Sequence, residues 1–307
     1  MKGLEEARRF YEEVGRDMLH RRFPEYEGRI AVGLVGHGSE CFGFDDELSR
    51  DHDFEQGFCL FLTDADDIRI GVELARAYRE LPIGRAEERS ALGESSRGVR
   101  RTGFFYRRYT GSPGAPQSLM QWLSLPSHAL AEATNGQIWR DELGEFSAIR
   151  ETLLHGMPED VRKKKLAARA VEMAQSGQYN YRRCLRHGEE GAALLALTDF
   201  VRAACGMIYL LNRAHMPYYK WMFRGMETLP LLGDLRPALE FLLTGENDEE
   251  GRRLKEGVAE DVCASVIREL RRQGLSHGGW DYLEPHAFEI QEHIENPQLR
   301  ALHIMEG

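Results

Sequence analysis

Apolar residues in the first half of the chain follow both helical and strand patterns. Leu4, Ala7, Phe10, Val14 and Met18 recur every three or four residues, which predicts an amphipathic helix over residues 4–20. Short apolar runs rich in β-branched or aromatic residues predict strands at 30–35, 54–62, 102–109 and 138–140. Helical periodicity predicts further helices at 66–81, 117–125 and 146–155.

Strand signals disappear from the second half of the chain. A long helical pattern begins at Pro158 and ends near His187, where Gly188 suits a helix stop. Further helical patterns follow at 189–214, 218–227, 235–243, 248–273 and 285–294. We therefore predict an α+β fold, in which a domain with a small mixed sheet (residues 1–156) precedes an all-α helical bundle (residues 157–307).

Composition adds few constraints to this picture. The net charge of −10 gives no bulk attraction to nucleic acid, so a long nucleic-acid partner is not expected. The five cysteines are scattered and form no Cys-x-x-Cys pair, which argues against structural zinc and a disulfide framework. No apolar run approaches the about 20 residues of a membrane span, so we expect a cytoplasmic protein without a membrane partner. We interpret the basic tract at 162–165 as a solvated helix face, with a nucleic-acid patch as the alternative.

Candidate chemistry is concentrated in residues 36–54. Gly38-Ser39 follows the first apolar strand, and after eleven intervening residues Asp51-His52-Asp53 opens the second. Residues two apart on a strand point to the same face, so Asp51 and Asp53 could share a divalent cation, Mg²⁺ or Mn²⁺, while His52 faces the other side. Gly38 would let the backbone approach a phosphate, and Ser39 offers a hydroxyl and an N–H group. The pattern predicts a metal–nucleotide site, and the alternative is a loop that is merely acidic.

This pattern resembles the signature of the polymerase-β-like nucleotidyltransferase superfamily, in which a Gly-Ser or Gly-Gly pair precedes an Asp-x-Asp or Asp-x-Glu. The whole stretch from Gly36 to Phe54 is similar, more closely, to the bacterial domain-of-unknown-function family 4037. Further similarities are the strings Ala133-Thr-Asn-Gly136, Asp141-Glu-Leu-Gly-Glu-Phe146, Gln178-Tyr-Asn180-Tyr-Arg182 and Tyr218-Tyr-Lys220-Trp221. The helical second half matches the layout of kanamycin- and lincosamide-type nucleotidyltransferases, which add a C-terminal bundle.

The resemblance implies roles for four residues. Asp51 and Asp53 would be catalytic metal ligands, and Gly38 and Ser39 would contact the triphosphate. Many members of the superfamily carry a third carboxylate on the strand beside the Asp-x-Asp strand. The strand expected at 102–109 contains no acid, which leaves the general base unassigned. Other candidates for this carboxylate are Asp141, Glu94 and Glu172.

The second half contributes three candidate nucleotide-binding residues. Asn180 and Arg183 are three apart on a predicted helix and could contact phosphates or the acceptor, or else pack between the domains. Lys220 could reach a phosphate or be an ordinary surface lysine.

The sequence thus predicts a Mg²⁺-dependent nucleotidyltransferase. It would move a nucleoside monophosphate, AMP from ATP or from another nucleoside triphosphate, to a hydroxyl on a small molecule, a protein or an RNA end. Because no third carboxylate is evident, the alternative is a catalytically degenerate domain that acts as a nucleotide-binding sensor or an antitoxin-like partner module.

Overall fold

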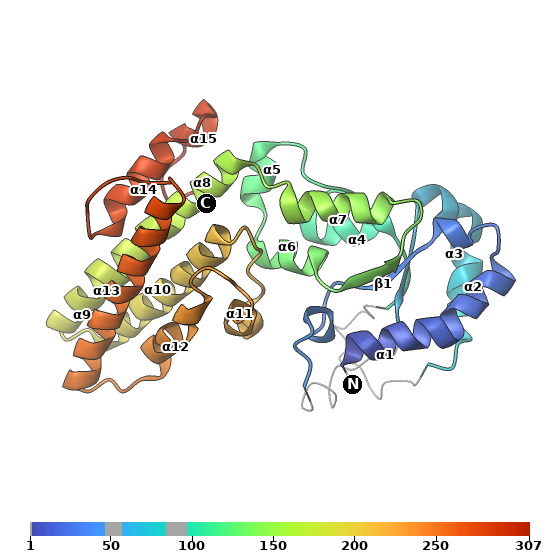
Figure 1. Ribbon diagram of the computed structural model, residues 1–307, viewed down its shortest axis with the longest axis horizontal. Helices are drawn as coiled ribbons and strands as arrows, with labels where there is room; N and C mark the ends of the chain where they lie inside the picture. Colours follow the sequence, from blue (N-terminus) through green and yellow to red (C-terminus); the bar gives the residue numbers. More distant parts are fainter. Residues whose placement is uncertain (1, 47–56, 84–96) are drawn as a thin grey trace. The chain divides into compact units, whose positions relative to one another are not determined.

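The computed structural model describes residues 2–46, 57–83 and 97–307 and forms two compact units. The first unit contains Met1–Pro116 and Pro126–Gly156, and the second contains Gln117–Leu125 and Met157–Gly307 (Figure 1). The helix at 117–125, which the sequence analysis placed in the first domain, therefore belongs to the second unit. Lys165 explains this placement, because its ammonium donates to the carbonyls of Leu123 (2.8 Å) and Leu125 (3.1 Å).

The sheet of the first unit has four short strands in the order β3-β2-β1-β4. The strands are β1 Ala31–Leu34, β2 Cys59–Leu62, β3 Gly98–Arg101 and β4 Gln137–Arg140. β1 is antiparallel to β2 and β4, whereas β2 and β3 are parallel. The pairs Gly33–Cys59, Cys59–Gly98 and Leu34–Gln137 place the end of β1 beside the starts of the other three strands. We call this end, where β1 ends and β2, β3 and β4 begin, the entry end of the sheet.

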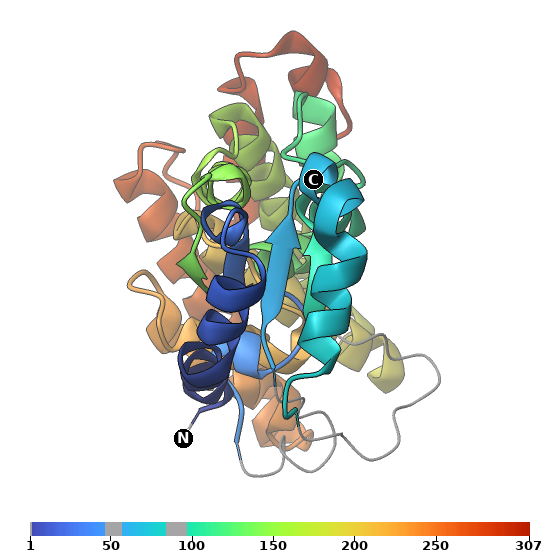
Figure 2. The ribbon, with the colours of Figure 1, turned by 90° about the vertical axis from the view of Figure 1, so that its right-hand side faces the viewer.

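Helices cover both faces of this sheet because successive strand residues point to opposite sides. On one face Phe58, Leu60 and Leu62 pack with the N-terminal helices and α3; Figure 2 shows α1 (dark blue) and α3 (cyan) on the same side of β2. On the other face Phe61 contacts Phe105 and Phe146, at ring-centroid distances of 5.2 and 4.3 Å. The helices of this unit are α1 Gly3–Phe10, a π-helical segment Tyr11–Gly15, α2 Arg16–Arg22, α3 Asp64–Arg79, α4 Thr102–Thr110, α6 Ser127–Thr134 and α7 Glu145–His155.

The predicted strand at 102–109 is wrong, because these residues form the helix α4. Aromatic residues favour strands by propensity, but here they follow the helical period. Phe105 and Tyr106 are buried and Tyr109 lies one turn further on, whereas Phe104 is 52% exposed. The strand that pairs with β2 is β3, four residues long and directly before α4. Its sequence, Gly-Val-Arg-Arg, also contains no acid.

The second unit is a helical bundle, and the predicted α+β fold class is therefore confirmed. The long helix expected from Pro158 is one continuous run in three parts, α8 Glu159–Met173, a π-helical segment η5 Ala174–Tyr181 and α9 Arg182–Arg186. The other helices are α5 Leu119–Ser124, α10 Glu190–Leu211, α11 Tyr219–Met226, α12 Arg236–Thr244, α13 Glu249–Arg272, α14 Leu283–Glu292 and α15 Pro297–Ala301. The helices α6 and α15 were not predicted from the sequence.

The central helix of the bundle is α10. Its buried residues, among them Leu197, Phe200 and Ile208, form the middle of the core of the second unit. By length and composition alone this helix could also cross a membrane, which the apolar pattern did not reveal because Asp199 and Arg202 interrupt it. Within the bundle, 56% of its most apolar window is buried.

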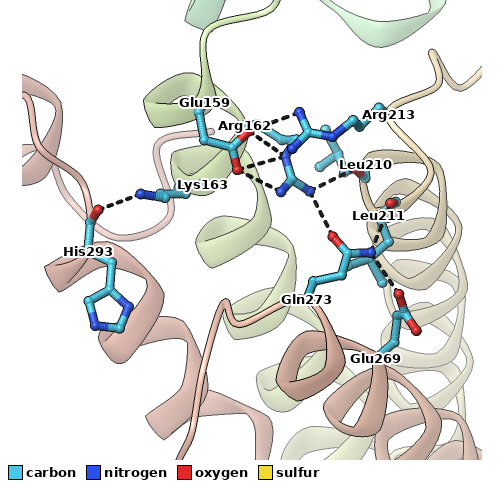
Figure 3. Close-up of polar contacts among 9 residues, drawn as sticks. All are labelled: Glu159, Arg162, Lys163, Leu210, Leu211, Arg213, Glu269, Gln273 and His293. Atoms are coloured by element: carbon cyan, nitrogen blue, oxygen red, sulfur yellow. Dashed lines mark hydrogen bonds and ion pairs between the residues drawn. The ribbon is translucent and has the colours of Figure 1, made fainter.

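The basic tract at 162–165 is not a solvated helix face, because Arg162 and Lys164 are buried. Arg162 binds Glu159 and donates to the Leu210 carbonyl (3.3 Å) and to Gln273 Oε1 (3.4 Å), which joins α8 to the ends of α10 and α13 (Figure 3). Lys164 donates to Gln291 Oε1 (2.7 Å) and to the His303 carbonyl (2.6 Å). The long aliphatic stems of these side chains pack against apolar surface, while their charged ends bind polar groups beyond it. The run of charges therefore led to a wrong prediction of a solvated face.

We expect Arg162→Ala to destabilise the second unit by about 2–3 kcal/mol, because buried hydrogen-bond acceptors lose their donor. Arg213→Ala is the matched control. Arg213 pairs with the same Glu159 carboxylate at 2.9 Å but its side chain is 62% exposed, so its loss should cost less than about 1 kcal/mol. Urea denaturation followed by circular dichroism measures both. Equal effects of the two variants would show that the buried network contributes nothing beyond a surface ion pair.

Candidate nucleotide-binding site

The Gly38-Ser39 pair lies in a tight loop directly after β1, at the entry end of the sheet. Gly38 has a φ of +126°, a conformation that side-chain-bearing residues rarely adopt. A Cβ atom there would also lie 2.6 Å from the Glu40 carboxylate. Ser39 then begins a single 3₁₀ turn, Glu40–Phe42, and its carbonyl accepts from the N–H groups of Phe42 (3.1 Å) and Phe44 (2.9 Å). The backbone of this loop is therefore fixed rather than extended into solvent.

Asn135, between α6 and β4, fixes the start of the same loop. Its Nδ2 donates to the Gly36 carbonyl, and its Oδ1 accepts from the Gly36 N–H, both at 2.7 Å. The next residue, Gly136, has a φ of +66°, and a Cβ atom there would lie 1.9 Å from the Leu34 carbonyl. The Asn135-Gly136 pair can therefore approach the β1 backbone only because position 136 has no side chain.

A buried ion pair ties the loop to β3. The side chains of Glu40 and Arg97 are 7% and 2% exposed and bind each other directly. Arg97 immediately precedes β3, and Glu40 follows Ser39, so the pair joins two strand ends at the entry end. Cys41 packs beside them, and burial raises the pKa of its thiol, which keeps it neutral. Thus Asn135 and the Glu40–Arg97 pair hold the loop from its two sides.

The predicted metal ligands, Asp51 and Asp53, lie outside the described residues. The segment that contains them rejoins the described chain at Gly57 and Phe58, just before β2, and the Phe58 carbonyl accepts from Gly98 N at 2.9 Å. The chain therefore enters β2 at the same end of the sheet as the Gly38-Ser39 loop. Within residues 2–46, 57–83 and 97–307 no group of three His, Cys, Asp or Glu side chains could hold a metal.

The candidates for a third carboxylate lie elsewhere. Asp141 follows β4 at the opposite end of the sheet, and its two oxygens accept from the N–H groups of Gly144 (3.1 Å) and Ser147 (2.7 Å) at the start of α7. Asp141 therefore caps the start of α7, at the end of the sheet away from the Gly38-Ser39 loop. Glu172 is in the second unit, paired with Arg169 at 2.8 Å. Glu94 is outside the described residues.

The three candidates from the second half have different surroundings. Asn180 is half-buried and lines a hollow of about 570 Å³ with Arg169, Glu172 and residues of α10. Arg183 is exposed, donates to the Tyr179 hydroxyl at 2.7 Å and lies over the tyrosine ring. Lys220 is exposed on α11.

The second unit does not bring Asn180 and Lys220 together. Gly177, near Asn180, packs on Phe200 of α10, whereas Tyr209 of α10 donates to the Met222 carbonyl of α11 at 2.8 Å. Nine residues separate these points on α10, which corresponds to about 14 Å along the helix. Nucleotide binding by Asn180, Arg183 and Lys220 stays a prediction for each residue separately.

Sequence reasoning missed the residues that fix the loop. Asn135 belonged to a string that was recognised only as a family similarity, and Glu40 and Arg97 are 57 residues apart. One local signal was available, the Asn-Gly pair before a short strand. Such a pair indicates a turn in which the asparagine side chain binds backbone groups and the glycine adopts a left-handed conformation.

Comparison with known proteins identifies a family for part of the chain. Residues 122–222 match the family model described as Domain of unknown function (DUF4037). This match includes Asn135, Asn180 and Lys220 but spans less than half of the chain and excludes Gly38, Ser39, Asp51 and Asp53.

Two further comparisons add little. Among curated protein sequences none matches this chain. The crystal structure of a nucleotidyltransferase-like protein from Exiguobacterium sibiricum is similar with a TM-score of 0.37 and 12% identity, over 84% of this chain and 79% of that one. A TM-score at this level carries no argument about function. The resemblance to domain-of-unknown-function family 4037, predicted from the sequence motifs, is confirmed by the match over residues 122–222.

Proposed function

We propose that this protein is a Mg²⁺-dependent nucleotidyltransferase that moves AMP from ATP to a hydroxyl acceptor. One observation carries the proposal: the Gly38-Ser39 loop is fixed at the entry end of the sheet, where the segment with Asp51 and Asp53 runs into β2. The proposed triphosphate loop follows β1, and the segment with the proposed metal ligands precedes β2. These two strands are neighbours in the sheet, so a triphosphate and a metal could be held at the same end. The Gly-Ser…Asp-x-Asp pattern of the sequence supports the same assignment.

The chemistry of these residues fits the proposed substrate. Asp51 and Asp53 would hold Mg²⁺ through hard carboxylate oxygens, the ligands that this ion prefers. When bound, the metal would neutralise charge on the triphosphate. Gly38 presents bare backbone, and Ser39 adds a hydroxyl, so the loop can approach phosphate oxygens closely. Because Asn135 and Glu40 hold the loop in place, the loop needs little reorganisation when a triphosphate binds.

The acceptor is proposed at the level of its chemistry, a hydroxyl on a small molecule, a protein or an RNA end. The net charge of −10 argues against a long nucleic-acid acceptor. Asn180, Arg183 and Lys220 are proposed contacts to nucleotide or acceptor.

Calorimetric titration of ATP with Mg²⁺ into wild type and an Asp51→Ala/Asp53→Ala variant tests the proposal. We expect binding by the wild type, at least about tenfold weaker binding by the variant, and loss of wild-type binding when EDTA removes the metal. The matched control is Asp17→Ala/Asp64→Ala, which removes two exposed carboxylates of the same unit (54% and 73% exposed) and should bind as the wild type does. Equal ATP binding by the wild type and the Asp51→Ala/Asp53→Ala variant, or none by either, would contradict the proposal.

A second candidate is a nucleotide-binding sensor or partner module without turnover. The absence of any acid from β3, the strand beside β2, favours it. The two candidates differ in one product: the enzyme releases pyrophosphate in the presence of a hydroxyl acceptor, whereas the sensor binds ATP and releases none.

A further inference from the structure

A carboxylate from a helix, rather than from the sheet, faces the Gly38-Ser39 loop. Glu132 is on α6, its side chain is 20% exposed, and its Oε1 lies 3.6 Å from Nδ1 of His37. His37 is 74% exposed and stands directly before Gly38. Glu132 is thus a mostly buried acid whose carboxylate lies beside an exposed imidazole, next to the proposed triphosphate loop.

The position of Glu132 is fixed by the same contacts that fix the loop. Three residues after Glu132, Asn135 binds both backbone groups of Gly36, and Arg150 of α7 donates to the Thr134 carbonyl at 2.7 Å. A Cβ atom on Gly36 would lie 3.0 Å from the Tyr109 hydroxyl, so α4 packs closely against the start of the loop. The helix that carries Glu132 and the loop therefore form one packed assembly within the first unit.

Two other acids near the loop, Glu40 and Asp45, have partners within the protein. Glu40 is buried against Arg97, and Asp45 Oδ2 accepts from the Gly3 N–H at 2.8 Å, at the start of α1. In contrast, among residues 2–46, 57–83 and 97–307 the only basic side chain within ion-pair distance of Glu132 is the imidazole of His37. Glu132 is the acid of this group that is free to exchange a proton with a bound molecule.

We propose that Glu132 is the general base of the transfer reaction, with His37 as the residue that positions its carboxylate. This inference rests on the proposed nucleotidyl transfer. The carboxylate takes the proton of the acceptor hydroxyl as the hydroxyl oxygen forms a bond to the α-phosphorus of ATP. The bond from the α-phosphorus to its bridging oxygen breaks, and pyrophosphate leaves with that electron pair. Helix α6 thereby supplies the acid that β3 lacks.

The pH dependence of this step depends on the groups that face Glu132. They are His37 from the loop and Tyr109 from α4. Burial raises the pKa of Tyr109, so this phenol stays protonated and neutral and does not compete as a base. The base form of Glu132 is the carboxylate, so the rate should rise with pH as the carboxylate forms and then level off.

The test compares Glu132→Gln with Glu142→Gln, a control at the opposite end of β4 whose carboxylate is 50% exposed and pairs with Arg140. Pyrophosphate release is measured from ATP and Mg²⁺ with glycerol as the hydroxyl probe, and ATP affinity is measured by calorimetry. We expect Glu132→Gln to keep its ATP affinity within about twofold, to lower kcat by about 10²–10⁴-fold and to lose the rise of kcat with pH. Glu132→Asp should fall between Glu132→Gln and the wild type, and Glu142→Gln should match the wild type.

The outcomes separate this inference from the proposed function. If the wild type releases pyrophosphate, an Asp51→Asn/Asp53→Asn variant does not, and Glu132→Gln keeps kcat within about threefold, then the base assignment alone is overturned. If the wild type releases none, or the aspartate variant releases as much as the wild type, then both the proposed function and the base assignment are overturned. Loss of ATP affinity in Glu132→Gln together with its activity would show a structural role and would also overturn the assignment.

Discussion

Replacement of Asp51 or Asp53 by Asn is expected to lower the rate of pyrophosphate release by roughly 10³-fold, because each carboxylate would hold the metal that stabilises charge in the transition state. Asparagine keeps the shape of the side chain but removes its negative charge, so folding should be preserved, with a Tm within about 2 °C of the wild type. The measurement is a pyrophosphate-release assay with ATP, Mg²⁺ and glycerol, alongside a thermal melt of each variant.

The residue between the two aspartates provides the matched control. His52 is expected to point to the other side of the strand, so His52→Gln should retain the rate of the wild type within about fivefold. Retention of full activity by Asp51→Asn and Asp53→Asn would contradict the metal-site assignment. So would an equal loss in all three variants, because the effect would then not depend on which face of the strand is changed.

Glu40→Gln is expected to have the largest effect on stability, a loss of about 3–5 kcal/mol, because it removes the carboxylate that binds the buried Arg97 guanidinium. The free energy of unfolding from urea denaturation measures this loss. An exposed pair of the same unit provides the control: Glu12→Gln removes the partner of Arg8, with both side chains more than half exposed, and should cost less than about 1 kcal/mol.

A double variant separates the stability of the fold from the position of the loop. Glu40→Leu/Arg97→Met replaces both charges by apolar groups and should recover most of the lost free energy of unfolding. We expect its ATP affinity to stay at least about fivefold below that of the wild type, because the charged pair no longer anchors the residue after Ser39. A cost below about 1 kcal/mol for Glu40→Gln would show that the pair does not hold the loop.

The elements that could be predicted from sequence are those whose pattern has one interpretation. β1, β2, α3, α7 and the helices of the second unit other than α15 follow apolar runs or helical periods bounded by clear stop residues. The aromatic run at 102–109 fits both a strand and a helix, and only packing decides: Phe105 and Tyr106 face Phe146, which is distant in sequence. The strand β3 is too short and too polar to be recognised before its pairing with β2 is known.

The candidate site divides in the same way. Gly38 and Ser39 could be predicted because glycine and serine carry the chemistry themselves. The other contacts join residues that are far apart in the sequence. Glu40 and Arg97 are 57 positions apart, and Gly36 and Asn135 are 99 positions apart. No local sequence pattern indicates such contacts, and the same holds for Glu132 and His37. Arg162 and Lys164 were misinterpreted for the same reason, since their partners lie on α10, α13 and α14.

A structure of the complex with a non-hydrolysable ATP analogue and Mg²⁺ tests the central claim most directly. The account predicts the triphosphate against Gly38 and Ser39, the metal on the Asp51 and Asp53 carboxylates, and Glu132 on the side from which the acceptor approaches. A triphosphate bound elsewhere, such as in the hollow beside Asn180 in the second unit, with Gly38 and Ser39 free of contacts to it, would contradict the account.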